Sequence, residues 1–215
     1  MNASSGGPPH PILINVGLVG TATRSLTHAL RALGLRAAHV GPCNVPYDLE
    51  NVGSNMSRFL DSRDAFSDIP FNGAGFIKVA VAYAAKYPEK VKLVATVRDK
   101  LAWIGSMLRN PGNGGCFIRL SYGIQCDHTT TPSDLSAMYD RHVGLLLQHN
   151  ITLLPMGQWG LLCEALHNFP PEILEACRRE KLRSAGDGLP RVSNFESPRD
   201  GDAGPCADHG WGSGY

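Results

Sequence analysis

Long apolar runs are missing from this 215-residue chain, and none approaches the roughly 18 residues that a membrane-spanning helix needs. Its start, residues 1–11, also lacks the charged-then-apolar order of a signal peptide. The formal net charge is only +1, which gives no general field that would attract nucleic acid or anionic lipid. We therefore expect a cytoplasmic protein with no transmembrane segment and no nucleic-acid partner, in which any anion-binding site is local.

Closely spaced cysteine pairs are absent as well. The six cysteines are widely separated and none belongs to a C-x-x-C pair. This spacing favours reduced thiols over a disulfide framework. The nearest approach to a metal-binding group is Cys116, Cys126 and His128, but its spacing fits no common zinc pattern, so we expect no metal.

Charged residues are sparse, at 18%, whereas the 43% of hydrophobic residues is ordinary for a globular protein. The 24 glycines and 15 prolines concentrate at both ends and in residues 110–115. We predict a disordered leader over residues 1–10, one domain over 11–195 and a disordered tail over 196–215.

The domain alternates between two hydrophobic periods. Apolar, β-branched runs predict strands at 12–16, 36–40, 91–97 and 151–154, and helical spacing predicts helices at 25–33, 74–87, 100–109, 133–150, 158–166 and 171–181. Gly34 is placed to close the first helix, and Ser133 or Asp134 to start the fourth. Alternating strands and helices imply an α/β fold with a parallel sheet, helices on both faces and ligands at the carboxyl ends of the strands.

The turn after the first strand, residues 17–26, is rich in small and hydroxyl side chains. Backbone N–H groups at such a turn can hold a phosphate or sulfate. The turn does not match G-x-x-x-x-G-K-[ST], because the first lysine of the chain is Lys78, and it does not match G-x-G-x-x-G. An ordinary nucleotide triphosphatase and a dinucleotide enzyme are therefore disfavoured, and a turn that only packs against the sheet stays an alternative.

A second motif lies at the end of the third predicted strand, where Arg98 is followed eight residues later by Ser106. A guanidinium at a strand end and a hydroxyl on the next helix suit a phosphate monoester. This segment resembles the 3′-phosphate-binding motif of sulfotransferases that use 3′-phosphoadenosine 5′-phosphosulfate (PAPS). The alternative is a surface ion pair between Arg98 and Asp99, with Trp103 in the core.

The resemblance extends over about residues 12–195. In the first turn, Thr21, Thr23, Ser25 and Leu26 match the phosphosulfate loop of the family. The remaining similar segments are Asp68-Ile69-Pro70, Tyr139 with Arg141-His142, Leu153-Leu154, Gln158-Trp159 with Leu162-Cys163 and Leu166, and Leu189-Pro190-Arg191-Val192-Ser193-Asn194. The shared order and spacing carry more weight than any single match.

This resemblance implies a P-loop-type α/β fold and transfer of a sulfuryl group from PAPS to a hydroxyl or amine of a small acceptor, without a metal. The implied site has three parts. The phosphosulfate group is held by Gly20, Thr21, Ala22, Thr23 and Ser25, the 3′-phosphate by Arg98 and Ser106, and the acceptor proton by Asp68 as general base. For Asp68, a helix cap is the alternative.

The loop departs from the family at two positions: Gly20 replaces a lysine or arginine, and Ala22 replaces a glycine. A loop cation stabilises the charge that builds on the leaving phosphate. We predict that Arg24 takes over this role, with Lys78 and Lys100 as the next candidates. A nucleotide-binding or interaction protein without activity is the alternative function, and a small-molecule kinase is disfavoured because the P-loop lysine is lacking.

His142 lies on the apolar face of the predicted fourth helix. A histidine in such a position is more often a hydrogen-bonded core residue than a functional group. We therefore assign it no role in the site.

Overall fold

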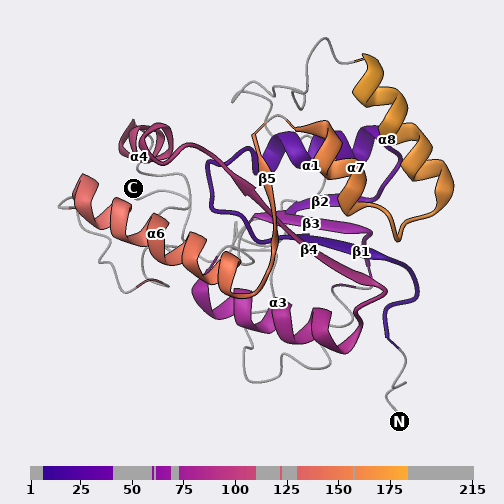
Figure 1. Cartoon of the computed structure of the whole chain (residues 1–215), viewed down its shortest axis with the longest axis horizontal. Helices are drawn as coiled ribbons and strands as arrows, with labels where there is room; N and C mark the ends of the chain where they lie inside the picture. Colours follow the sequence, from indigo (N-terminus) through magenta and orange to yellow (C-terminus); the bar gives the residue numbers. More distant parts are fainter. Residues whose placement is uncertain are drawn as a thin grey trace, which may run out of the picture.

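The sheet of this computed structural model has five parallel strands in the order β2-β3-β1-β4-β5 (Figure 1). The structure describes residues 7–40, 60, 62–68, 73–109, 122, 130–156 and 158–183. The strands are β1 (Ile12–Asn15), β2 (Ala37–Val40), β3 (Ala65–Asp68), β4 (Val91–Val97) and β5 (Thr152–Pro155). This arrangement confirms the predicted α/β fold.

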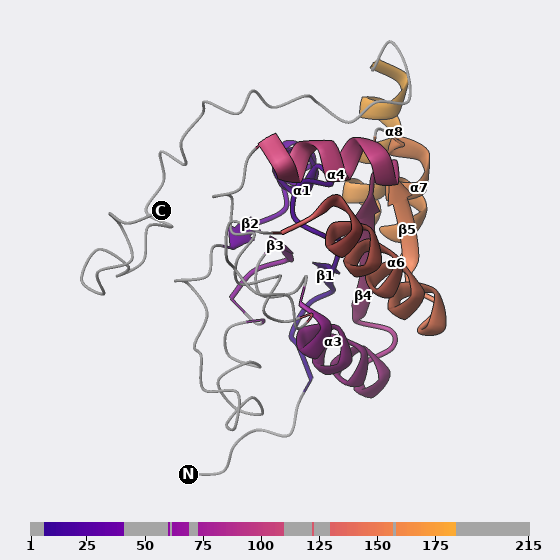
Figure 2. The same cartoon turned by 90° about the vertical axis from the view of Figure 1, so that its left-hand side faces the viewer.

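Helices cover both faces of the sheet, as the sequence predicts. They are α1 (Thr23–Ala32), α3 (Ala74–Lys86), α4 (Lys100–Arg109), α6 (Pro132–Gln148), α7 (Trp159–Ala165) and α8 (Pro171–Arg183). Figure 1 shows α1, α7 and α8 on one face, with α3 and α6 on the other. Figure 2 shows α4 beside α6, and the two helices are in contact.

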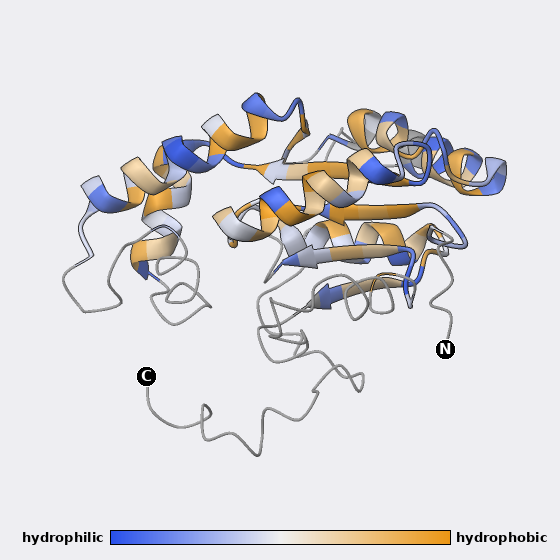
Figure 3. Ribbon diagram, turned by 90° about the horizontal axis from the view of Figure 1, so that it is seen from below, coloured by the Kyte–Doolittle hydropathy of each residue, from blue (hydrophilic) through white to orange (hydrophobic). Residues whose placement is uncertain are grey.

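The central strand β1 is buried on both faces, which explains its unbroken apolar run. Leu13 packs into the layer under α1, α7 and α8, whereas Ile12 and Ile14 pack into the layer over α3 and α6. Figure 3 shows sheet strands that are largely hydrophobic, with hydrophilic colour at some of the arrowheads. Polar residues stand at the carboxyl ends of β1 and β3, which finish at Asn15 and Asp68.

Strand β1 is also the switch point of the topology. The chain leaves β1 through α1 toward β2 on one side, and it later adds β4 on the other side. Ligands of open parallel sheets bind in the crevice outside such a point. The turn at residues 17–26 therefore occupies the expected place for a ligand.

One strand was not predicted. The segment Ala65–Asp68 is short and half polar, so it lacks the apolar run that marks a buried strand. It is nevertheless fully inserted between β1 and β2, and all four residues are buried. Hydrogen bonding of Ser67 to its neighbours makes this burial possible, because a buried polar group needs a partner.

The helix ends agree with the predictions at one place and differ at another. Gly34 has a φ of +89° just after α1, as a left-handed helix terminus requires. Helix α6 begins before the expected Ser133 or Asp134 cap. Thr131 is the actual cap, because its hydroxyl accepts from the N–H of Asp134 at 3.2 Å and the Asp134 carboxylate accepts from the N–H of Thr131 at 2.9 Å.

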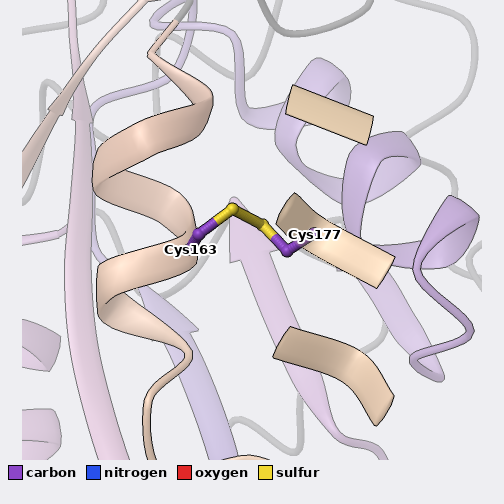
Figure 4. The surroundings of a disulfide bond; sticks show 2 residues. All are labelled: Cys163 and Cys177. Atoms are coloured by element: carbon purple, nitrogen blue, oxygen red, sulfur yellow. A yellow bond between two sulfur atoms is a disulfide. The ribbon is translucent and has the colours of Figure 1, made fainter. Parts of the chain in front are cut away.

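The prediction of reduced thiols is wrong for one pair of cysteines. Cys163 of α7 and Cys177 of α8 form a disulfide that joins the two helices (Figure 4). Their separation of 14 residues gave no sign of this, since the bond depends on α8 folding back against α7. The other four cysteines lie outside the described residues, and so does His128, which was considered with Cys116 and Cys126 as a metal-binding group.

Three further observations concern the start of the chain, a membrane span and a metal site. Residues 7–10, assigned to the leader, are described, and the carbonyl of Pro8 accepts a hydrogen bond from Lys90 Nζ at 2.8 Å. Among the described helices, none combines the length and the apolar character needed to cross a bilayer. Within the same residues, no group of three or more His, Cys, Asp or Glu side chains is arranged to hold a metal ion.

Candidate functional site

The loop between β1 and α1 has the backbone conformation of an anion cradle. Gly20 and Ala22 adopt left-handed conformations, with φ of 78° and 73°, and Thr21 between them does not. Alternation of this kind turns successive N–H groups toward one concavity. The N–H of Thr21 already donates to the carbonyl of Leu18 at 3.3 Å. No side chain of the described residues caps α1, and its first turn carries no acidic residue, so the first N–H groups of the helix remain for an anion.

A buried hydrogen-bond network under the loop fixes its position. The amide nitrogen of Asn15 donates to the hydroxyls of Ser67 at 2.8 Å and Thr96 at 3.1 Å. Its oxygen accepts from the N–H of Thr96 at 2.9 Å and of Gly17 at 3.1 Å. Asn15 thus ties together the carboxyl ends of β1, β3 and β4. The sequence reasoning missed this residue, although a polar side chain at the end of an apolar strand was a usable signal.

Thr21 and Gly17 also help to fix the position of the loop. The Thr21 hydroxyl bonds to the carbonyl of Leu18 and lies 2.9 Å from the hydroxyl of Thr96. A β-carbon on Gly17 would lie 2.3 Å from the carbonyl oxygen of Thr96, so only glycine allows the loop to approach β4 this closely. The side chain of Thr21 therefore shapes the loop, which leaves ligand contacts to neighbouring groups.

Asp68 lies beside the loop, at the end of β3. It is 7% exposed and has a φ of 82°, an unusual backbone conformation for a residue other than glycine. Its Oδ2 is 2.9 Å from Nε2 of His39, the residue before the last in β2, and the same Nε2 is 3.2 Å from the hydroxyl of Thr23 in α1. The helix-cap alternative for Asp68 is wrong, because the cap of α3 is Gly73.

The sequence reasoning missed His39, because its role depends on strand pairing. The register of β2 with β3 sets Val40 opposite Asp68 and His39 opposite Ser67, a pairing that no local pattern reveals. The three side chains do not form a catalytic triad of the Ser-His-Asp kind. In such a triad the acid and the hydroxyl engage different ring nitrogens, whereas Asp68 and Thr23 both contact Nε2 here.

Trp103 connects the loop to α4. Its ring is fully buried, as the alternative interpretation of this segment predicts, and Nε1 donates to the carbonyl of Val19 at 2.8 Å. A β-carbon at Gly20 would lie 3.7 Å from Nε1 of Trp103 and 3.8 Å from Sδ of Met107. Helix α4 is therefore packed directly against the loop.

The two residues of the predicted 3′-phosphate clamp flank this contact. Arg98 follows β4 and is half-buried, and within the described part of the chain no hydrogen bond or ion pair engages its guanidinium. Asp99 does not pair with it; instead the Asp99 carboxylate accepts from the N–H of Ala102 at 2.9 Å and so starts α4. Ser106 is half-buried and lies three residues after Trp103, on the neighbouring face of α4.

The basic side chains considered for the loop cation have different surroundings. Arg24 is exposed on the first turn of α1, next to the loop, and Ser25 beside it is half-buried. Lys78 is exposed on α3. Lys100 forms an ion pair of 2.6 Å with Asp140 of α6. Of the three cations, Arg24 is thus the one on the element that carries the loop.

A tyrosine and a histidine of the neighbouring elements have shifted pKa values. Partial burial raises the pKa of Tyr139, and the nearby carboxylates of Asp99 and Asp140 raise it further, so its hydroxyl stays a donor to the carbonyl of Arg98. Burial lowers the pKa of His142 to about 4, and the carbonyl of Val16 opposes this shift only in part.

His142 has the core position that we expected. It is 1% exposed, and its Nδ1 bonds to the hydroxyl of Tyr122, whose own pKa is raised by burial. Its Nε2 has no well-aligned hydrogen-bond partner in the part of the chain that the structure describes. His142 is therefore a neutral core residue at ordinary pH.

Neither a protein-family model nor a curated protein matches the sequence. Parts of the resemblance also lie outside the described residues, namely Ile69-Pro70 and residues 189–194. The features that bear on function are therefore the loop after β1, Arg98, and the side chains of Asp68, His39 and Thr23, called here the Asp68 group.

Proposed function

We propose that the protein transfers a sulfuryl group from PAPS to a hydroxyl or amine of a small acceptor. The observation that carries this proposal is the loop after β1, with its left-handed residues at Gly20 and Ala22 and an uncapped α1 behind it. Such a loop suits a doubly anionic phosphosulfate group, with Thr23 and Ser25 as neighbouring hydroxyl donors.

The position of Arg98 supports a cofactor with a second phosphate. Its guanidinium has no protein partner among the described residues and lies at the end of the strand that borders β1. Trp103 holds α4, and with it Ser106, against the same loop. A nucleotide with phosphates at both the 5′ and the 3′ positions would use both sets of groups.

The reaction requires a proton acceptor, and Asp68 is our candidate. In the proposed step, a bond forms between the acceptor oxygen or nitrogen and sulfur while the bond from sulfur to the bridging oxygen breaks. The acceptor proton passes to the Asp68 carboxylate, and adenosine 3′,5′-bisphosphate leaves with the bridging oxygen. Arg24, exposed beside the loop, would stabilise the charge on this leaving group.

A nucleotide-binding or interaction protein without activity is the second candidate. The observation in its favour is Gly20, which stands where the resembled family has a lysine or arginine and whose φ of +78° makes any replacement strained.

The cytoplasmic location stays a prediction. The disulfide between Cys163 and Cys177 weighs against it, because disulfides are rare in the cytosol.

A transfer assay with PAPS and a panel of hydroxyl and amine acceptors tests the proposal. We expect measurable turnover, which Arg24→Ala reduces by about a hundredfold and Asp68→Asn reduces without loss of bisphosphate affinity. Arg109→Ala, at the far end of α4, is the matched control and should retain full turnover. Turnover that is indifferent to Arg24→Ala would refute the role of Arg24, and no turnover with any acceptor would favour the second candidate.

A further inference from the structure

We propose that His39 is a positioning residue that prepares the hydroxyl of Thr23 to donate a hydrogen bond to the 5′-phosphosulfate group, with Asp68 fixing the imidazole. This inference rests on the proposed function, because it assigns a role at the same loop. It concerns a residue that no motif of the sequence singled out.

Asp68 fixes the tautomer of His39. Oδ2 of Asp68 lies 2.9 Å from Nε2, and Asp68 is buried with only 7% of its surface exposed. A carboxylate can only accept a hydrogen bond, so Nε2 must carry a proton that points toward Asp68. The carboxylate thus sets which nitrogen of His39 is protonated.

The hydroxyl of Thr23 lies 3.2 Å from the same Nε2. The single hydrogen on Nε2 points toward Asp68, so this nitrogen has no lone pair to accept the Thr23 proton. The Thr23 oxygen can at most share the Nε2 hydrogen with Asp68, and the hydroxyl proton is left for a different acceptor. Had the imidazole carried its proton on Nδ1, Nε2 would have taken the Thr23 proton for itself. Asp68 and His39 together therefore keep Thr23 as a donor.

Thr23 is held at a fixed place beside the loop. Thr23 is the first residue of α1 and directly follows Ala22, whose left-handed conformation shapes the loop. Its carbonyl is held by the hydroxyls of Ser67 at 3.2 Å and Thr27 at 3.1 Å, so the residue is fixed from behind. A donor fixed at the start of an uncapped helix has an anionic oxygen as its natural partner.

The experiment compares two nucleotides by calorimetry: adenosine 3′,5′-bisphosphate and 3′-AMP, which lacks the 5′-phosphate. His39→Leu should lower the affinity for the bisphosphate about tenfold and leave the affinity for 3′-AMP unchanged, since only the 5′-phosphate uses Thr23. Thr23→Val should cause the same selective loss. The double variant should lose no more than either single variant, because both remove one interaction.

Two further variants separate positioning from folding. His39→Gln keeps a side-chain N–H within reach of Asp68 and Thr23, so it should recover part of the loss seen for His39→Leu. His28→Leu, at an exposed position of α1, is the matched control and should change neither affinity. If His39→Leu does not fold, His39→Gln takes its place: it should lower the affinity for the bisphosphate only, and by less than Thr23→Val does. An equal loss for both nucleotides in His39→Gln would overturn the role of His39.

The outcomes distinguish this inference from the function beneath it. Equal losses for both nucleotides, or additive losses in the double variant, would overturn the role of His39 while the proposed function stands. If the unmodified protein binds the bisphosphate no better than 3′-AMP, the 5′-phosphate site itself is refuted and the inference falls with it.

Discussion

Among single residues, Ala22 has a strained backbone conformation in the loop. Its φ of 73° and ψ of 30° are left-handed, and a β-carbon in this conformation costs about 1–2 kcal/mol. A glycine would adopt this conformation without the β-carbon cost. The strained backbone marks the loop as a place where shape matters more than stability.

Replacing this residue gives a direct test of the strain. Ala22→Gly should raise the free energy of unfolding by about 1 kcal/mol, because glycine relieves the left-handed conformation. The same change at Ala82, exposed in the middle of α3, should lower it by about 0.5–1 kcal/mol. Urea denaturation of both variants measures the difference, and a loss of stability in Ala22→Gly would contradict a left-handed backbone at this position.

His142 predicts how stability depends on pH. Its pKa is about 4 in the folded protein against 6.5 for an exposed histidine, so between these values the unfolded chain binds more protons. Stability is therefore fully present above pH 6.5 and falls as the pH drops toward 4. The loss from this residue is about 2 kcal/mol between pH 7 and pH 5.

Denaturation curves for the protein and for His142→Leu at a series of pH values check this prediction. The variant should be less stable at pH 7, because the Tyr122 hydroxyl loses its partner, but its stability should change less between pH 7 and pH 5. Other groups titrate equally in both proteins, so the difference in slope isolates His142. Parallel slopes would show that His142 is not buried in neutral form.

At the scale of elements, the strands and helices that were predicted correctly are those with a strong apolar period. Strand β4 and helix α4 have the predicted boundaries, because Val91–Val97 is β-branched and Trp103, Ile104 and Met107 follow one helical face. Strand β3 was not predicted, because Ser67 and Asp68 are polar. Their burial depends on partners that are distant in sequence.

The site divides along the same line. Arg98, Ser106 and the first turn were recognisable because each belongs to a local pattern. For Asn15 the sequence shows only a polar side chain at the end of an apolar strand, because its partners lie 52 and 81 residues away. His39 has no local signal at all, because its partners depend on the β2–β3 register.

The disulfide between α7 and α8 should have a measurable effect on the stability of the fold. Closing a loop of this length restricts the unfolded chain and stabilises the fold by about 3 kcal/mol. Cys163→Ala, Cys177→Ala and the double variant should therefore have similarly lowered stabilities under non-reducing conditions, because losing either sulfur breaks the same bond. Losses that add in the double variant would show that the two thiols are not linked.

At the scale of the whole molecule, the fold brings three groups to the carboxyl edge of one sheet. The loop follows β1, the Asp68 group lies where β2 and β3 end, and Arg98 follows β4. These neighbouring strands meet at the switch point, where a parallel sheet binds ligands. Under the proposed function, one nucleotide would contact the loop and Arg98 together, and Asp68 would receive the acceptor proton.

Calorimetric titration with adenosine 3′,5′-bisphosphate and with AMP is the sharpest test of the proposed PAPS site. The protein should bind the bisphosphate at least tenfold more tightly than AMP, because the 3′-phosphate adds charge-assisted hydrogen bonds to Arg98 and Ser106. Arg98→Ala should abolish this preference, whereas Arg109→Ala, at the exposed last residue of α4, should preserve it. Equal affinities for the two nucleotides in the unmodified protein would contradict the assignment of a PAPS site.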